Sequence, residues 1–210
     1  MHIALPWKIA DTVRRRASSY DRSGGNSDFW TWEPGETKLI LDHAGASGAV
    51  QRMWFTLNSK DPAYLRRTMV TMVFDDEETV SCIPFGMLVG TGPWAVNDLT
   101  SPVASVMRSR MMNKDNAMPG FGSFNLTWRM PFARSARISI QNHSTESLMV
   151  FFYVDYVTDM AADADGGDLL FHATHRRAEF TVPQTRASEQ AAGTIDLAPG
   201  EAKNLSADGN

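Results

Sequence analysis

A short polar stretch at residues 18–28 holds the residue types in this sequence that are best suited to binding a hydroxylated ligand. Carboxylates accept hydrogen bonds, a guanidinium donates them, and an amide does both. Gly24 and Gly25 allow left-handed backbone angles, and Gly-Gly-Asn is typical of a tight turn. The stretch, called the opening loop below, is therefore expected to gather five substrate-binding side chains: Tyr20, Asp21, Arg22, Asn26 and Asp28.

The same residue types also fit a simpler interpretation. Loops are polar wherever they meet solvent, and an exposed Asp21–Arg22 ion pair contributes little to stability. In that case the opening loop only connects two strands. Residue types alone leave both interpretations open.

Tryptophans are the second group of candidates, because the apolar face of a sugar ring stacks on an indole. Most tryptophans of β-sandwiches belong to the core, so we expect three or more of the candidates to be buried. Trp94 follows Gly92-Pro93 and is expected in a loop, where it would form a stacking wall of the binding site. The candidates are Trp30, Trp32, Trp54, Trp94 and Trp128.

Carboxylates are the third group, because glycoside hydrolysis generally uses two of them, roughly 5 Å apart for retention and further apart for inversion. Asp21 and Asp28 flank the Gly-Gly turn and are placed to face each other. The acidic run at residues 75–78 is typical of a solvated hairpin tip. Asp155 lies in an apolar run, where a charge needs a partner, and Arg137 is one conceivable partner.

Metal and nucleophile chemistry find less support. His172 and His175 have a spacing that shares one face of a helix, but no third carboxylate ligand stands nearby. A structural or surface role is favoured over zinc, and we expect neither a metal nor a cofactor. Cys82 lies in a strand pattern and is expected to be a small buried hydrophobe. We find no serine nucleophile elbow and no phosphate-binding glycine loop.

Composition describes an ordinary globular chain of 210 residues, with 43% hydrophobic and 21% charged residues and a net charge of -4. This length suits one all-β domain. The sequence has no long basic run, so nucleic acid is not an expected partner. It has no apolar run of membrane-spanning length. The first residues lack the apolar core of a signal peptide, which predicts a cytoplasmic protein.

Period-two alternation predicts strands over residues 68–74 and 136–142, and a central apolar strand over 148–157. Short helices are expected at 9–14 and 62–67, and a long irregular loop at 95–118. Gly and Pro punctuation between short strands indicates a β-sandwich or jelly roll, mainly antiparallel, with few short helices. We predict an N-terminal segment (1–17), a jelly-roll domain (18–186) and a poorly ordered tail (187–210).

The opening loop also carries a family resemblance. Residues 15–28 resemble the opening motif of glycoside hydrolase family 172, long known as domain of unknown function 2961. Further segments resemble that family in the same order, so the resemblance extends over residues 14–177. These segments are residues 52–57, 65–67, 74–79, 84–92, 130–138, 153–156 and 171–177.

The resemblance implies jelly-roll domains, oligomers built on a trimer, and exo-acting retaining hydrolysis of α-D-fructofuranosides or D-arabinofuranosides. It also implies a glutamate nucleophile and a glutamate acid/base in a second jelly roll, beyond the residues that match, so no catalytic residue is assigned here. Two positions depart from the family pattern. Met87 stands where the family often has Asp, and Thr174-His175 replaces a usual aromatic residue.

Three hypotheses follow. The chain is the N-terminal half of a furanosidase, truncated or complemented by a second jelly-roll chain, and incomplete for catalysis alone. Alternatively it is a non-catalytic carbohydrate-binding sandwich, or a structural assembly subunit. In each case we expect a homo-oligomer or a second jelly-roll partner, and in the first two a furanoside-containing carbohydrate as ligand.

Overall fold

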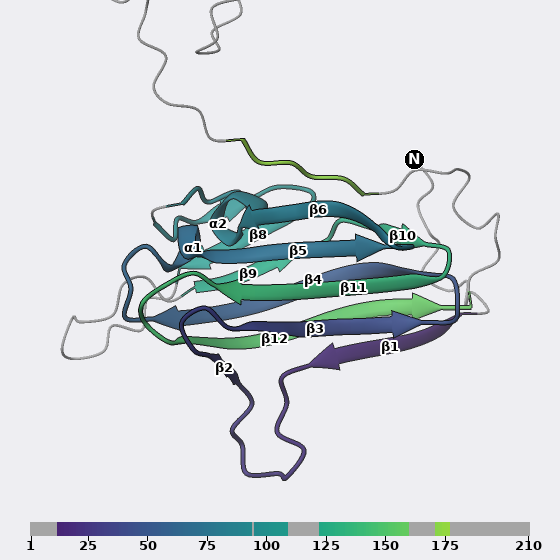
Figure 1. Cartoon of the computed structure of the whole chain (residues 1–210), viewed down its shortest axis with the longest axis horizontal. Coiled ribbons are helices and arrows are strands. Elements are labelled where there is room, and N and C mark those ends of the chain that lie inside the picture. The colour runs from purple at the N-terminus through teal and green to yellow at the C-terminus, as the bar shows by residue number, and fades with distance from the viewer. Residues whose placement is uncertain (1–11, 94, 109–121, 160–170, 177–210) are drawn as a thin grey trace, which may run out of the picture. The chain divides into compact units, whose positions relative to one another are not determined.

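The computed structural model describes residues 12–93, 95–108, 122–159 and 171–176. Its elements are β1 (Val13–Ser18), β2 (Trp30–Trp32), β3 (Thr37–Ala44), β4 (Gly48–Ser59), α1 (Tyr64–Arg67), β5 (Thr68–Phe74), β6 (Glu77–Pro84), α2 (Phe85–Leu88), β7 (Leu99–Thr100), β8 (Ala104–Arg108), β9 (Gly122–Leu126), β10 (Met130–Phe132), β11 (Ser135–Asn142) and β12 (Leu148–Thr158). All of them lie in the unit formed by residues 1–175 (Figure 1).

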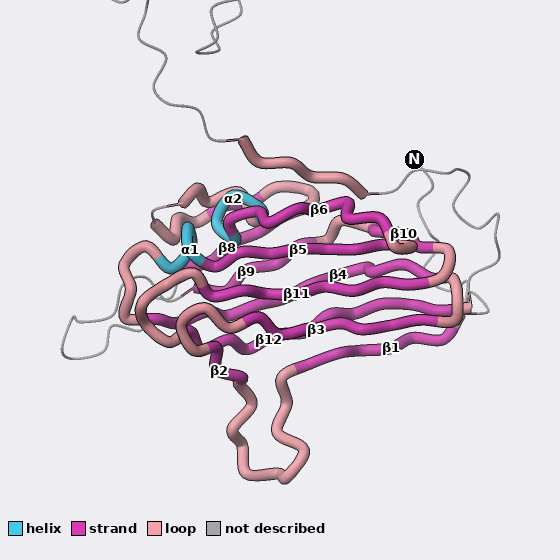
Figure 2. The backbone as a smooth tube through the Cα atoms, in the orientation of Figure 1, coloured by secondary structure: helices cyan, strands magenta, loops and turns pink. Residues whose placement is uncertain are grey.

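Two antiparallel sheets face each other. Sheet A runs β1-β12-β4-β9-β8-β7, with β2 beside β12 and β10 beside β4, and sheet B runs β3-β11-β5-β6. Figure 2 shows how little helix accompanies them. The predicted all-β, mainly antiparallel sandwich with few short helices is therefore confirmed. In the described residues no helix approaches the length that crossing a membrane would take, since α1 and α2 have four residues each.

The core lies between the sheets because alternate side chains of each strand point inward. In β5, every second residue from Thr68 to Phe74 is buried, as period-two alternation predicts. Aromatic rings fill the middle of the core, where Phe85 meets Phe55 and Phe124 edge to face at centroid distances of 5.3 and 5.1 Å. Such pairs add about 0.5–1.5 kcal/mol beyond the area that they bury.

The hairpin between β5 and β6 turns through Asp75 and Asp76, both left-handed with φ of 54° and 71°. Two left-handed residues suit the twist of a two-residue hairpin. The expectation of a merely solvated tip is incomplete, because the Asp75 carboxylate accepts the backbone N–H groups of Ala133, Arg134 and Ser135 at 2.7, 2.6 and 3.0 Å. This hairpin tip therefore fixes the turn that leads into β11.

Three local expectations need correction. The helix expected at residues 9–14 is strand from Val13 onward, because β1 pairs with β12, so the sheet begins before the boundary expected at residue 18. The irregular segment expected at 95–118 contains the β7–β8 hairpin in its described part. Cys82 is exposed rather than buried, in an edge strand with φ of 47°.

The helix expected near residues 62–67 is present as α1. The tail 187–210 lies outside the described residues.

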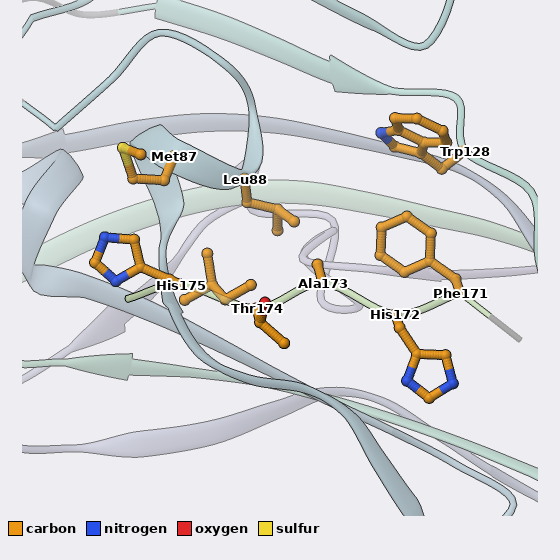
Figure 3. Close-up of a pocket in the computed structure, with 9 residues that line it drawn as sticks. Met87, Leu88, Trp128, Phe171, His172, Ala173, Thr174 and His175 are labelled. Atoms are coloured by element: carbon orange, nitrogen blue, oxygen red, sulfur yellow. The ribbon is translucent and has the colours of Figure 1, made fainter. Parts of the chain in front are cut away.

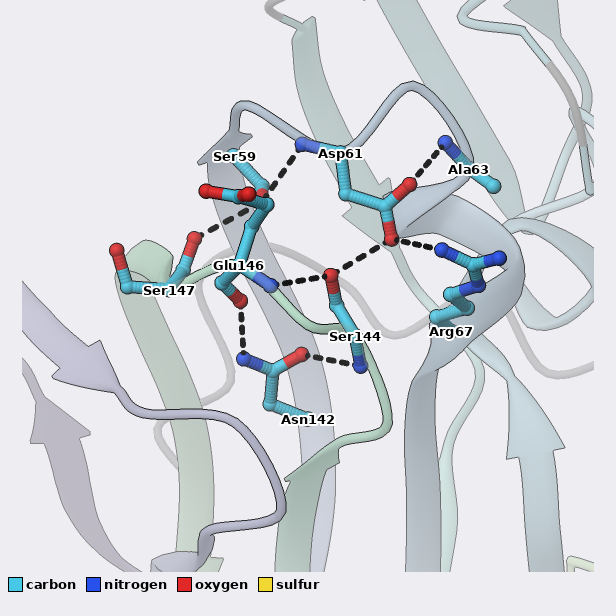
Figure 4. A network of polar contacts seen from close by, with 8 residues as sticks. All are labelled: Ser59, Asp61, Ala63, Arg67, Asn142, Ser144, Glu146 and Ser147. Carbon is cyan, nitrogen blue, oxygen red and sulfur yellow. Dashed lines mark hydrogen bonds and ion pairs between the residues drawn. The ribbon is translucent and has the colours of Figure 1, made fainter.

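A buried polar network, centred on Asp61 and missed in the sequence, holds the turn after β4 to the loop before β12 (Figure 4). The Asp61 carboxylate, 4% exposed, accepts Ser144 Oγ at 2.7 Å, Ala63 N at 2.9 Å and Arg67 Nη1 at 2.9 Å. Burial alone would raise its pKa, but these three donors outweigh burial and lower the pKa of Asp61. We call this group the Asp61 network.

Candidate functional site

The opening loop leaves the sandwich at the edge formed by β1 and projects away from both sheets before the chain returns as β2 (Figure 1). Both flanking strands pair with β12, so the two ends of the loop are held by one strand. The sequence therefore builds a protruding loop on a fixed base.

Ser19 fixes that base. Its side chain is buried, receives the Phe152 N–H at 2.9 Å and donates its hydroxyl to the carbonyl of Asp28 at 2.7 Å. One hydroxyl thus joins the first residue of the loop, its far end and the central strand β12. A buried hydroxyl with both roles satisfied favours a single loop position.

Asp21 organises the tip. Its carboxylate accepts the Ser23 hydroxyl at 2.6 Å, the Ser23 N–H at 2.8 Å and the Ser27 N–H at 3.2 Å. The Ser23 hydroxyl first, and then the two backbone donors, lower the pKa of Asp21. Asp21 is therefore a charged acceptor that gives the loop its shape.

Asp28 has a similar task, since its Oδ1 accepts the Asp21 N–H at 2.7 Å. The pairing that we expected between these two carboxylates is thus a link through backbone, and both of them hold the loop. Of the two interpretations of the sequence, local structure describes Asp21 and Asp28 better than ligand contact does.

Gly24 and Gly25 are needed at the tip of the opening loop for different reasons. Gly24 and Asn26 take the left-handed angles, with φ of 79° and 60°. Gly25 instead provides space, because a Cβ there would lie 2.8 Å from Asp21 Oδ2. The tip can close around the Asp21 carboxylate only when residue 25 has no side chain.

Three side chains of the loop remain available to a ligand. Tyr20 is 55% exposed, and Arg22 and Asn26 are exposed as well. None of the three has a hydrogen bond or ion pair to another described residue. The structure therefore presents a phenol, a guanidinium and an amide together on a loop that the two aspartates hold in place.

Trp94 lies outside the described residues. Its neighbour Gly92 donates its N–H to the Gly86 carbonyl of α2, which follows β6. β6 is the edge strand of sheet B on the side opposite to β3. The stacking wall predicted at Trp94 therefore stays a prediction.

The remaining tryptophans correct a further expectation. Of the four described candidates, only Trp32 is buried, and Trp54 is partly covered. Trp30 and Trp128 are 38% and 39% exposed. The expectation that three or more would be core is wrong for the described residues, because three of them lie at edges or on outer faces of the sandwich.

The outer face of sheet A carries a cluster that sequence reasoning missed. Arg16 pairs with Asp155 through two bonds of 2.5 and 3.0 Å, so Arg137 is not the partner. The Arg16 guanidinium lies 4.5 Å from the Tyr153 ring centroid, and Tyr153 stacks on Trp54 at 5.0 Å. The register of β1 against β12 creates the cluster, and a sequence pattern does not reveal register.

His172 and His175 do not share a helix face, because the segment around them is extended. His172 Nε2 lies 4.0 Å from Glu77 Oε1. Within the described ranges, no three His, Cys, Asp or Glu side chains gather as ligands for a metal ion.

Comparison with known families yields a match over most of the chain. The sequence model described as GH172 first beta-sandwich domain matches residues 10–162, which include the opening loop and every described strand. Among curated proteins, none matches the chain.

Proposed function

The chain belongs to glycoside hydrolase family 172, and from this premise we propose that it is the first sandwich of an exo-acting furanoside hydrolase. The proposed substrates are α-D-fructofuranosides or D-arabinofuranosides. The observation that carries the proposal is the opening loop, where Tyr20, Arg22 and Asn26 stand exposed on a rigid base inside the matched segment.

The chemistry of these three side chains suits a furanose. A guanidinium and an amide can donate to neighbouring hydroxyls, while the amide oxygen and the phenol accept from them. Because the Asp21 carboxylate holds the turn, a ligand would not have to order the loop on binding. Preorganisation of this kind lowers the entropic cost of binding.

Catalysis is proposed to need a second sandwich, in the same polypeptide or in another. The carboxylates of the loop support this view, because Asp21 and Asp28 both hold backbone N–H groups. A general acid needs a pKa near the working pH, and the pKa of Asp21 is shifted the other way. We therefore assign the loop to binding and the proton transfers to groups elsewhere.

Calorimetry with methyl α-D-arabinofuranoside and methyl α-D-fructofuranoside tests the binding role. Arg22→Ala is expected to abolish binding at the opening loop and to leave the melting temperature unchanged, since Arg22 has no partner among the described residues. Arg14→Ala, another exposed arginine on the same chain segment, is the matched control and should bind normally. Unaltered binding by Arg22→Ala would contradict the proposal.

A non-catalytic carbohydrate-binding subunit is the second candidate, and the engaged loop carboxylates favour it. The two candidates separate in an assay with aryl furanosides, in which the chain is mixed with the second sandwich of a family member. Turnover that neither partner shows alone supports the hydrolase. Sugar binding without turnover in the mixture supports the binding subunit.

Self-association is proposed with either function. Several large apolar side chains are exposed, among them Leu39 at 47% and Met107 at 70%, and exposed apolar surface promotes association. Sedimentation at micromolar protein concentration is expected to show an oligomer, and a clean monomer would contradict this part.

A further inference from the structure

A cavity lies at the β6 edge of the sandwich, and the opening loop projects from the opposite edge (Figure 1). The segment after residue 170 runs beside β6, where Ala173 forms a parallel bridge with Val80 and donates its N–H to the Thr79 carbonyl at 3.0 Å. Between this segment and α2 is a cavity of about 470 Å³. Its described lining residues are Ile83, Met87, Leu88, Trp128, Phe171, His172, Ala173, Thr174 and His175 (Figure 3).

The walls of the cavity differ in character. Trp128 and Phe171 form an aromatic wall at one end, with ring centroids 5.6 Å apart. Met87 and His175 stand at the other end, and His172 points away from His175 (Figure 3). The cavity volume falls within the roughly 300–1,000 Å³ that is usual for small-ligand sites.

The polar groups of this cavity are available. Thr174 and His175 are exposed and have no hydrogen bond or ion pair with another described residue. A hydroxyl and an imidazole can each donate and accept. No Lys, Arg, Asp or Glu is among the described lining residues, so a charged ligand would find no permanently charged side chain in the wall.

From these observations we infer that the cavity binds a neutral hydroxylated ring, such as a furanose residue of a carbohydrate. The aromatic wall covers the apolar face of the ring, while Thr174 and His175 bond to its hydroxyls. The choice of a furanose rests on the proposed function, whereas the position of the site does not. It would be a second sugar site, separate from the opening loop.

The cavity wall combines residues from distant parts of the chain. Met87 and the Thr174-His175 pair, which come from distant parts of the chain, line the same cavity. Met87 contributes an apolar thioether and no charge to this wall, which favours a neutral ligand over a charged one. Phosphorylated sugars are therefore expected to bind worse than neutral ones.

The test follows the indole N–H signals of the ¹⁵N-labelled full chain by NMR during titration with methyl α-D-arabinofuranoside. The Trp128 signal, assigned with Trp128→Phe, is expected to shift saturably. Trp54, whose indole N–H donates to Ser123 Oγ on the outer face of sheet A, lies at neither proposed site and is the internal control. Arabinose 5-phosphate should shift the Trp128 signal less at equal concentration.

Variants separate this inference from the proposed function. In the Arg22→Ala background, calorimetry with methyl α-D-arabinofuranoside is expected to show that Trp128→Ala weakens binding by roughly tenfold or more, the scale of one lost aromatic contact and its buried area. His175→Ala and Thr174→Val remove exposed groups and serve if Trp128→Ala fails to fold. Arg22→Ala should leave the Trp128 shift intact, even if it abolishes binding at the loop.

Two results would overturn the inference. One is a Trp128 signal that does not move at saturating sugar while the opening loop still binds. The other is a shift that persists unchanged in His175→Ala and Thr174→Val. A change of sedimentation in Trp128→Ala without any sugar response would indicate that the cavity contacts another protein chain instead.

Discussion

Asp21 and Asp61 each accept several donors, at least one hydroxyl and one backbone N–H in both cases, yet the two aspartates lie in opposite surroundings. Asp61 is 4% exposed and joins a turn, a helix and a distant loop. Asp21 lies on a protruding loop and binds only residues within that loop. The same chemistry therefore stabilises the whole sandwich in one case and shapes one loop in the other.

The largest effect is expected from Asp61→Ala. Removing a buried acceptor leaves Ser144 and Ala63 without their partner, and the free energy of unfolding should fall by about 3 kcal/mol. The melting temperature should then fall by roughly 6–12 °C. Thermal and urea denaturation measure this, with Asp42→Ala as the exposed-carboxylate control. An equal loss of unfolding free energy in Asp61→Ala and Asp42→Ala would contradict a stabilising role of the buried Asp61 carboxylate.

Asp61 is also expected to make the stability of the sandwich depend on pH in the acidic range. The pKa of Asp61 in the folded state is lower than its pKa in the unfolded chain. In the unfolded chain an Asp side chain has the model-peptide pKa of about 3.9. Its contribution to stability is thus complete above that pH and is lost as the pH falls through the folded pKa. Urea unfolding over an acidic pH series should show a shallower decline for Asp61→Ala than for the natural chain. Parallel curves would contradict this.

Asp21→Ala should lower the melting temperature less than Asp61→Ala does, because the hydrogen bonds of Asp21 are exposed and confined to the loop. The local effect should be clear, with faster hydrogen exchange of the Ser23 and Ser27 amides. A fall in melting temperature as large as that of Asp61→Ala would erase the contrast between the two regions.

Gly25→Ala should change stability least. The new Cβ would approach Asp21 Oδ2 to 2.8 Å, so the tip must open, while the sandwich keeps all of its contacts. NMR is expected to show shifts for loop amides only, together with weaker sugar binding. Shifts that reach β12 would show that the loop is coupled to the sheet more tightly than its contacts indicate.

Sequence patterns were sufficient where neighbours along the chain determine the structure. Alternation located β5 and β11, which have one buried face, and a long apolar run located the central strand β12. Patterns failed where partners are remote. The pairing of Asp155 with Arg16 depends on the register of β1 against β12, and the β7–β8 hairpin forms from a stretch without clear alternation.

The candidate site was predicted in part. The sequence identified the opening loop and its polar residues, but it did not divide them into those that hold the loop and those that are available. That division depends on hydrogen bonds between Asp21, Ser23 and Ser27, which follow from φ angles at Gly24 and Asn26. The cavity lining was unpredictable because Met87, Trp128 and His175 meet only through the tertiary fold.

Cys82 is a natural site for attaching a spectroscopic label. It is the single cysteine of the sequence and is exposed on β6, next to Ile83 of the cavity wall. A maleimide dye would therefore label one defined position without any engineering, and its emission would report directly on events at that edge of the sandwich. The same thiol would join two chains under oxidising conditions, so a reductant belongs in every sedimentation buffer.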